Sequence, residues 1–146
     1  MNTTKRSTIA AMLSALMIVA GFLTAAVHAQ EPAKPLKEQL IGSWQLVGVQ
    51  LNHTEAYGKN PQGFMSIDAG GHIAVIVLSN GQARNISYFG TYIVDDADGS
   101  MTLHINGSSA PNADGREIKR TIAFAGEELV MGNSKGTVKL TWKRAG

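Results

Sequence analysis

From about residue 43 onward, hydrophobic and polar residues alternate in short runs, and Gly, Asn or Asp separates one run from the next. In the last run, Val138, Leu140 and Trp142 share one face, while lysine and threonine occupy the other. A period of two residues is typical of a β-strand with one buried face. Eight such runs predict eight strands, which are Ser43–Leu51, Gly63–Asp68, His72–Leu78, Ser87–Val94, Ser100–Asn106, Glu117–Phe124, Glu128–Gly132 and Thr137–Lys143.

Most links between the predicted strands are short and rich in turn residues, as in Ala69-Gly70-Gly71 and Ala125-Gly126-Glu127. Short links pair sequential strands antiparallel, and strands that each have one apolar face can close on themselves. We therefore expect an all-β protein with an eight-stranded antiparallel up-and-down β-barrel. A sandwich of two sheets is the competing architecture. Asn52–Gln62 and Gly107–Arg116 are longer links, which predict loops at an open rim.

Residues 1–29 have the pattern of a secretory signal peptide. Lys5 and Arg6 precede an apolar run, and Val27-His28-Ala29 supplies small or tolerated residues at a cleavage site. A membrane anchor is the alternative, because the stretch between Arg6 and Glu31 carries no charge and is long enough to span a bilayer. Cleavage predicts a periplasmic or secreted protein without stable membrane insertion.

A tether and one helical turn are expected between the leader and the first strand. Residues 30–36 contain two prolines and predict the tether, and Leu36–Ile41 places its apolar residues on one side of a single turn. The barrel domain is then expected over residues 37–146.

The composition excludes several classes of function. The chain has 13 basic and 11 acidic residues, and removal of Lys5 and Arg6 with the leader equalises them, so the charge gives no support to a nucleic-acid partner. There is no cysteine, which excludes disulfides, thiol catalysis and Cys-based metal sites. His53, His72 and His104 lack the spacing of metal ligands, so we expect no metal and no cofactor.

Several segments carry a family resemblance. Leu40-Ile41-Gly42-Ser43-Trp44 leads into the first strand, Tyr88-Phe89-Gly90-Thr91-Tyr92 lies in the fourth, and Leu140-Thr141-Trp142-Lys143-Arg144 ends the last. In order and spacing, from about Leu36 to Arg144, the chain resembles the bacterial and fungal lipocalin-like domain family. The resemblance implies that Trp44 of the Gly42-Ser43-Trp44 motif closes one barrel end and that Arg144 or Lys143 covers its indole. The link Ser79–Asn85 is shorter than in that family, so no ligand preference follows from the resemblance.

An eight-stranded barrel leaves room for side chains or for one small ligand. We therefore expect a non-enzymatic, monomeric module that binds a small, largely apolar molecule. The candidate lining residues are Leu46, Phe64, Val75, Tyr88, Tyr92, Leu103, Arg120, Ile122, Leu129 and Leu140.

Arg120 is the charged member of this set, since its strand neighbours Ile118 and Ile122 are apolar. A guanidinium cannot shed its charge inside a barrel and therefore needs an anionic or polar partner. An internal ion pair, for which Asp68 is one candidate, and a clamp for a ligand carboxylate are both open.

Two other functions stay open as hypotheses. An isomerase or cyclase would use His104, Arg120 and Tyr92 to polarise a carbonyl or move a proton. The family pattern has a histidine at position 104, but alternation with Leu103 and Ile105 places its side chain outward. An inhibitor barrel of the cell envelope would instead insert its N-terminal arm, Gln30–Leu36, into a partner protein.

Overall fold

The structure is a computed structural model, and it describes residues 34–81 and 84–146. The predicted leader and most of the predicted tether lie outside the described residues. No helix within those ranges has the length and apolar character needed to cross a membrane. The elements in chain order are α1 (Leu36–Leu40), β1 (Gly42–Leu51), β2 (Thr54–Glu55), β3 (Gln62–Ile67), β4 (His72–Leu78), β5 (Ile86–Asp95), β6 (Ser100–Ser108), β7 (Glu117–Ala125), β8 (Glu128–Gly132) and β9 (Val138–Arg144).

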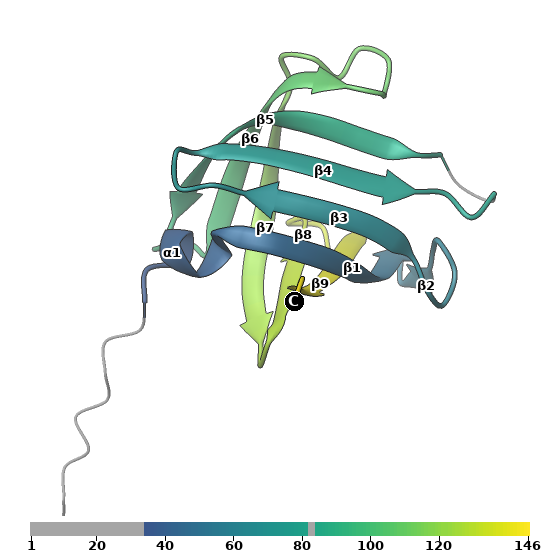
Figure 1. Cartoon of the computed structure of the whole chain (residues 1–146), viewed down its shortest axis with the longest axis horizontal. Helices are drawn as coiled ribbons and strands as arrows, with labels where there is room; N and C mark the ends of the chain where they lie inside the picture. The colour runs from purple at the N-terminus through teal and green to yellow at the C-terminus, as the bar shows by residue number, and fades with distance from the viewer. Residues whose placement is uncertain (1–33, 82–83) are drawn as a thin grey trace, which may run out of the picture. The chain divides into compact units, whose positions relative to one another are not determined.

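The eight long strands form a closed antiparallel barrel. From β3 to β9 each strand pairs with the next, β1 pairs with β3, and β1 also pairs with β9 from Trp44 opposite Arg144 to Leu51 opposite Val138. Figure 1 shows β3, β4 and β5 side by side, with β7, β8 and β9 behind them. The predicted fold class is confirmed, and the pairing of β1 with β9 excludes a sandwich of two open sheets.

All eight predicted strands are present, with ends that differ from the prediction by at most two residues. The strand β2 was not predicted, and it lies in the expected rim loop after Leu51. Asn52 and His53 both have positive φ and turn the chain back, so that Thr54 pairs with Leu51. This pairing is possible because the ladder between β3 and β1 ends at Gln45 and leaves the later part of that edge of β1 without a paired strand.

The interior is filled by the inward members of each alternating pair. In β4, Ile73, Val75 and Val77 are almost fully buried, whereas Ile76 and Leu78 lie on the outer face. Two bulges shift this alternation. Val47 is the extra residue between Leu46 and Gly48, and Asn106 is the extra residue opposite the Phe89–Gly90 step.

Candidate functional site

Trp44 occupies the barrel end at which α1 leads into β1. Its indole Nε1 donates a hydrogen bond to the Leu40 carbonyl oxygen at 2.8 Å, and its ring lies 6.2 Å from that of Phe124. The side chain is 1% exposed. Trp44 therefore packs as a structural plug, which is the position that the family resemblance implies for it.

Arg144 covers the plug from outside. Its guanidinium carbon lies 4.1 Å from the centroid of the Trp44 ring, and its two terminal nitrogens donate to the carbonyl oxygens of Ile41 and Gln39. Gly42 permits this approach, because its φ is +133° and a Cβ there would lie 2.5 Å from Arg144 Nη1. The end of the last strand is thereby fastened to the start of the first.

We expect Arg144→Gln to lower the free energy of unfolding by about 1–2 kcal/mol, through loss of the cation–π contact and the two charge-assisted hydrogen bonds. Urea unfolding followed by circular dichroism measures the change. Lys143→Gln is the matched control, since Lys143 is exposed and its pairing with Glu128 at 3.5 Å should contribute less than about 1 kcal/mol. Equal losses in the two variants would contradict the assigned role of Arg144.

A cavity of about 170 Å³ lies at the other end of the barrel. Its walls come from the five strands β1, β4, β5, β7 and β9 and from Tyr57 in the loop after β2. Eight of its ten lining residues are aliphatic or tyrosine side chains of these strands, and the complete set is Val49, Leu51, Tyr57, Val75, Val77, Ile86, Tyr88, Arg120, Val138 and Leu140. The cavity is therefore an apolar chamber that contains one cationic group.

Arg120 points inward from β7, where it shares the inner face with Ile118 and Ile122. Its Nε is buried and has no hydrogen-bond partner among the described residues. None of the three ion pairs found within those residues includes it. Because a buried N–H donor without a hydrogen-bond partner is costly, the Nε of Arg120 is the polar atom in the chamber that most needs a partner.

Asp68, the carboxylate considered for an internal ion pair, pairs with His72 and not with Arg120. It lies in the turn between β3 and β4, where its Oδ2 is 3.0 Å from His72 Nδ1 and its Oδ1 accepts the His72 backbone N–H at 2.8 Å. These contacts, with the backbone hydrogen bond as the larger cause, lower the pKa of Asp68 below its ordinary value. Asp68 is therefore not the partner in an internal ion pair with Arg120, because the turn holds Asp68 on the outside of the barrel.

Tyr88 also lines the chamber, and its phenol interacts electrostatically with Arg120. Burial raises the pKa of its phenol, and the positive charge of Arg120 offsets this only in part. The hydroxyl therefore stays protonated at neutral pH. A neutral phenol can donate a hydrogen bond to a ligand, but it cannot compensate the charge of Arg120.

Tyr57 was not predicted to line the chamber. It lies in the loop after β2 with a φ of +65°, and its hydroxyl donates to the Arg84 carbonyl oxygen at 2.9 Å. The ring is 7% exposed, so it forms part of the chamber wall rather than of the solvent surface. The loop carries no alternating pattern, and the sequence therefore gave no signal for this residue.

Four of the ten predicted lining residues line the chamber, namely Val75, Tyr88, Arg120 and Leu140. Five others point inward but belong to the packed core away from it, and these are Leu46, Tyr92, Leu103, Ile122 and Leu129. Phe64 lies on the outer face and is 45% exposed, so its predicted inward position is wrong. Its neighbours Met65 and Ile67 take the inward positions of β3, and alternation then turns Phe64 out.

The histidine, arginine and tyrosine considered for catalysis are not gathered at one site. His104 is exposed on the outer face of β6, where it lies opposite Glu117 of β7. Tyr92 is buried outside the chamber, and its hydroxyl donates to the Asp68 carbonyl oxygen at 2.8 Å. Of the three, only Arg120 lines the chamber. Alternation along β6 correctly indicates that His104 points outward.

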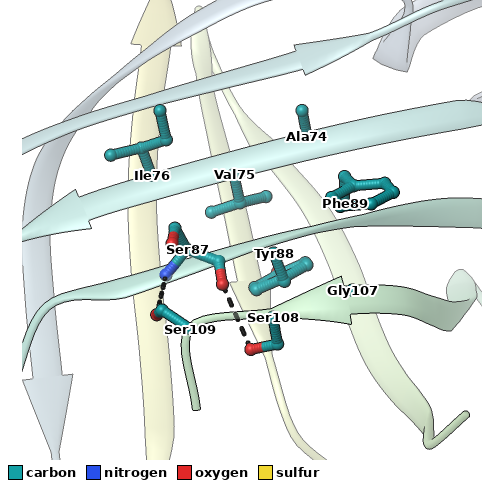
Figure 2. Close-up of a pocket in the computed structure, with 9 residues that line it drawn as sticks. All are labelled: Ala74, Val75, Ile76, Ser87, Tyr88, Phe89, Gly107, Ser108 and Ser109. Carbon is teal, nitrogen blue, oxygen red and sulfur yellow. Dashed lines mark hydrogen bonds between the residues drawn. The ribbon is translucent and has the colours of Figure 1, made fainter. Parts of the chain in front are cut away.

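A second hollow, of about 350 Å³, lies along the outer face of β4, β5 and β6 and is drawn in Figure 2. Ile76, Ala74 and Phe89 supply its apolar part. The backbone N–H of Ser87 donates to the Ser109 hydroxyl at 3.0 Å, and the Ser108 hydroxyl donates to the Ser87 carbonyl oxygen at 3.1 Å. Figure 2 shows both hydrogen bonds as dashed lines. These polar groups are already paired, and the groove holds no charged side chain, so it offers less to a ligand than the chamber does.

The chain matches no known protein family and no curated protein in sequence comparisons. The closed antiparallel barrel is consistent with a calycin-like fold, while the lipocalin-like family stays a prediction. Within residues 34–81 and 84–146, no three His, Asp or Glu side chains lie together in a way that could hold a metal ion.

Proposed function

We propose that this protein is an exported, monomeric barrel that binds a small, largely apolar molecule in the chamber at its open end. The observation that carries the proposal is a chamber of about 170 Å³ with almost entirely apolar walls. An apolar cavity of roughly 150 Å³ is large enough to take up benzene, whereas sites for drug-sized molecules span roughly 300–1,000 Å³. The ligand is therefore close to a single aromatic ring in size.

Export is part of the proposal because of the leader pattern at residues 1–29. Lys5 and Arg6, the apolar run and the small residues before Gln30 support secretion to the periplasm or beyond. Outside the cytoplasm, a chain without disulfides has to rely on its core for stability, and a closed barrel leaves no unpaired edge between its first and last strands.

Val75→Phe tests the chamber directly. The added ring should occupy the chamber and weaken the binding of benzyl alcohol by at least about tenfold, equivalent to about 1.4 kcal/mol. Binding is measured by saturation-transfer NMR and by titration of the thermal midpoint of the purified protein. Circular dichroism confirms that the variant is folded.

Ile76→Phe is the matched control, since Ile76 adjoins Val75 on the same strand but is 47% exposed on the outer face. We expect this variant to bind benzyl alcohol as the original protein does. Equal binding by the Val75 variant and the original protein, or loss of binding in the Ile76 variant alone, would place the ligand outside the chamber and contradict the proposal.

A further inference from the structure

We infer that the ligand is a small carboxylic acid of about the size of benzoic acid, which binds as a monoanion with its carboxylate on Arg120. The inference rests on the proposed function and specifies the chemical class of the ligand. It follows from the one charged group in the chamber, from what surrounds that group and from the size of the space beside it.

Arg120 is charged under all ordinary conditions, and it lines the chamber with its Nε buried and unpartnered. The described part of the chain supplies no carboxylate for it, since Asp68 contacts His72 instead. The chamber has no second charged side chain among its lining residues. A site with one uncompensated cation in apolar surroundings favours a ligand that brings one negative charge.

A carboxylate matches this site better than a dianion such as a phosphate monoester. One guanidinium balances one charge, and a second negative charge on the ligand would stay buried and unpaired. The Nε–H and one terminal N–H of a guanidinium form a planar fork that fits the two oxygens of a carboxylate. Tyr88, which also lines the chamber, can donate a further hydrogen bond from its hydroxyl on β5.

The remaining walls determine the body of the ligand. Val49, Val75, Val77, Val138 and Leu140 present only aliphatic surface, so the part of the ligand beyond the carboxylate has to be apolar. The volume of about 170 Å³ accommodates one ring or a short alkyl chain. Long fatty acids therefore exceed the chamber, and a single-ring or short-chain acid fills it.

The test compares benzoate with benzamide, its neutral near-isostere, by calorimetric or NMR titration of the purified protein. The original protein should bind benzoate about 10- to 100-fold more tightly than benzamide, which is the range expected for a buried charge-assisted hydrogen-bonded pair. Arg120→Met should abolish this preference, because it removes the cation that pairs with the carboxylate. Arg120→Lys keeps the charge without the fork and should restore the preference in part.

Lys119→Met is the matched control. Lys119 precedes Arg120 on β7 but points outward, where its Nζ lies 2.6 Å from Asp98 Oδ2. Lys119→Met removes the same charge from the protein without changing the chamber, so we expect the preference for benzoate over benzamide to persist. Loss of the preference in this variant would assign the effect to the overall charge and overturn the inference.

A second measurement separates a ligand-binding arginine from a structural one. Removal of a half-buried arginine whose buried Nε is unpartnered should raise the thermal midpoint of the ligand-free Arg120→Met variant, whereas removal of a structural contact should lower it. A lowered midpoint together with unchanged benzoate binding would overturn the inference. If the original protein binds benzyl alcohol but does not prefer benzoate over benzamide, the inference is overturned and the proposed function stands. If the original protein binds neither benzyl alcohol nor benzoate, the proposed function is overturned.

Discussion

Trp44→Ala should lower the free energy of unfolding by about 3–5 kcal/mol, the range for removal of a fully buried large aromatic side chain. The indole is 1% exposed and packs against Phe124. Its removal also leaves the Leu40 carbonyl oxygen without its 2.8 Å hydrogen bond and takes away the ring beneath Arg144. Three contributions at the closed end of the barrel are thus lost together.

Equilibrium unfolding in urea, followed by far-ultraviolet circular dichroism, measures this loss. Trp44→Phe is the informative comparison, because it keeps most of the apolar area and loses the N–H donor, and we expect a cost of about 2 kcal/mol. The remaining tryptophan, Trp142, reports on the barrel by fluorescence in both variants. A loss below about 1 kcal/mol for the alanine variant would show that the end is held by other contacts.

The second large effect is expected at Gly90, where β5 passes the Asn106 bulge of β6. A Cβ at this position would overlap the His104 carbonyl oxygen and would lie 2.9 Å from the carbonyl carbon. Both atoms belong to the backbone of the paired strand, which cannot move aside as a side chain could. Gly90→Ala should therefore lower the free energy of unfolding by about 3 kcal/mol or more, which is at the upper end of the losses caused by overpacking.

Gly136→Ala is the control for the substitution itself. Gly136 lies in the turn before β9 with a φ of +68°, and nothing lies within 4 Å of a Cβ placed there. Gly136→Ala should therefore lower the free energy of unfolding by about 1–2 kcal/mol, which is the cost of holding alanine in a left-handed backbone conformation. Thermal and urea unfolding of the two variants give the comparison. Similar losses of unfolding free energy in the Gly90 and Gly136 variants would mean that β6 shifts at the bulge to accept the added methyl group. This result would contradict the predicted clash.

Two polar side chains at the Trp44 end of the barrel are paired with the backbone, since Trp44 and Arg144 both donate to carbonyl oxygens of the α1 region. The buried Nε of Arg120 in the chamber has no partner among the described residues, and neither has the buried Nε1 of Trp142 in the core. Of these two groups, only Arg120 lines the chamber, so under the proposed function its unmade hydrogen bond is the one available to a ligand.

The strands and their inward faces could be predicted from the sequence because the signal is local. In β9, Val138, Leu140 and Trp142 alternate with polar residues, and the pleat of a strand turns that alternation directly into a buried face. The same argument placed Arg120 inward and His104 outward. The inward placement of Phe64 was wrong, because Met65 and Ile67 occupy the inward positions of that strand and alternation turns Phe64 outward.

The extent of the chamber could not be predicted in the same way. Some inward residues, such as Leu103 and Leu129, lie in packed layers, and others face the chamber. The stagger of the strands around the barrel decides between these two positions. That stagger is a property of all eight strands together. Tyr57 shows the limit most clearly, since it reaches the chamber from a loop through a positive φ that no periodic pattern records.

The pairing of β1 with β9 also has a consequence for how the chain folds. Arg144 bonds to Ile41 across 103 positions of sequence, so the barrel can close only after almost the whole chain has been synthesised. Until then, hairpins such as β3–β4 can form locally, but β1 and β8 present unpaired edges to their surroundings. A chain that stalls before its final strand is therefore expected to be prone to aggregation, and closure of the ring is expected to be the slow, late event of folding.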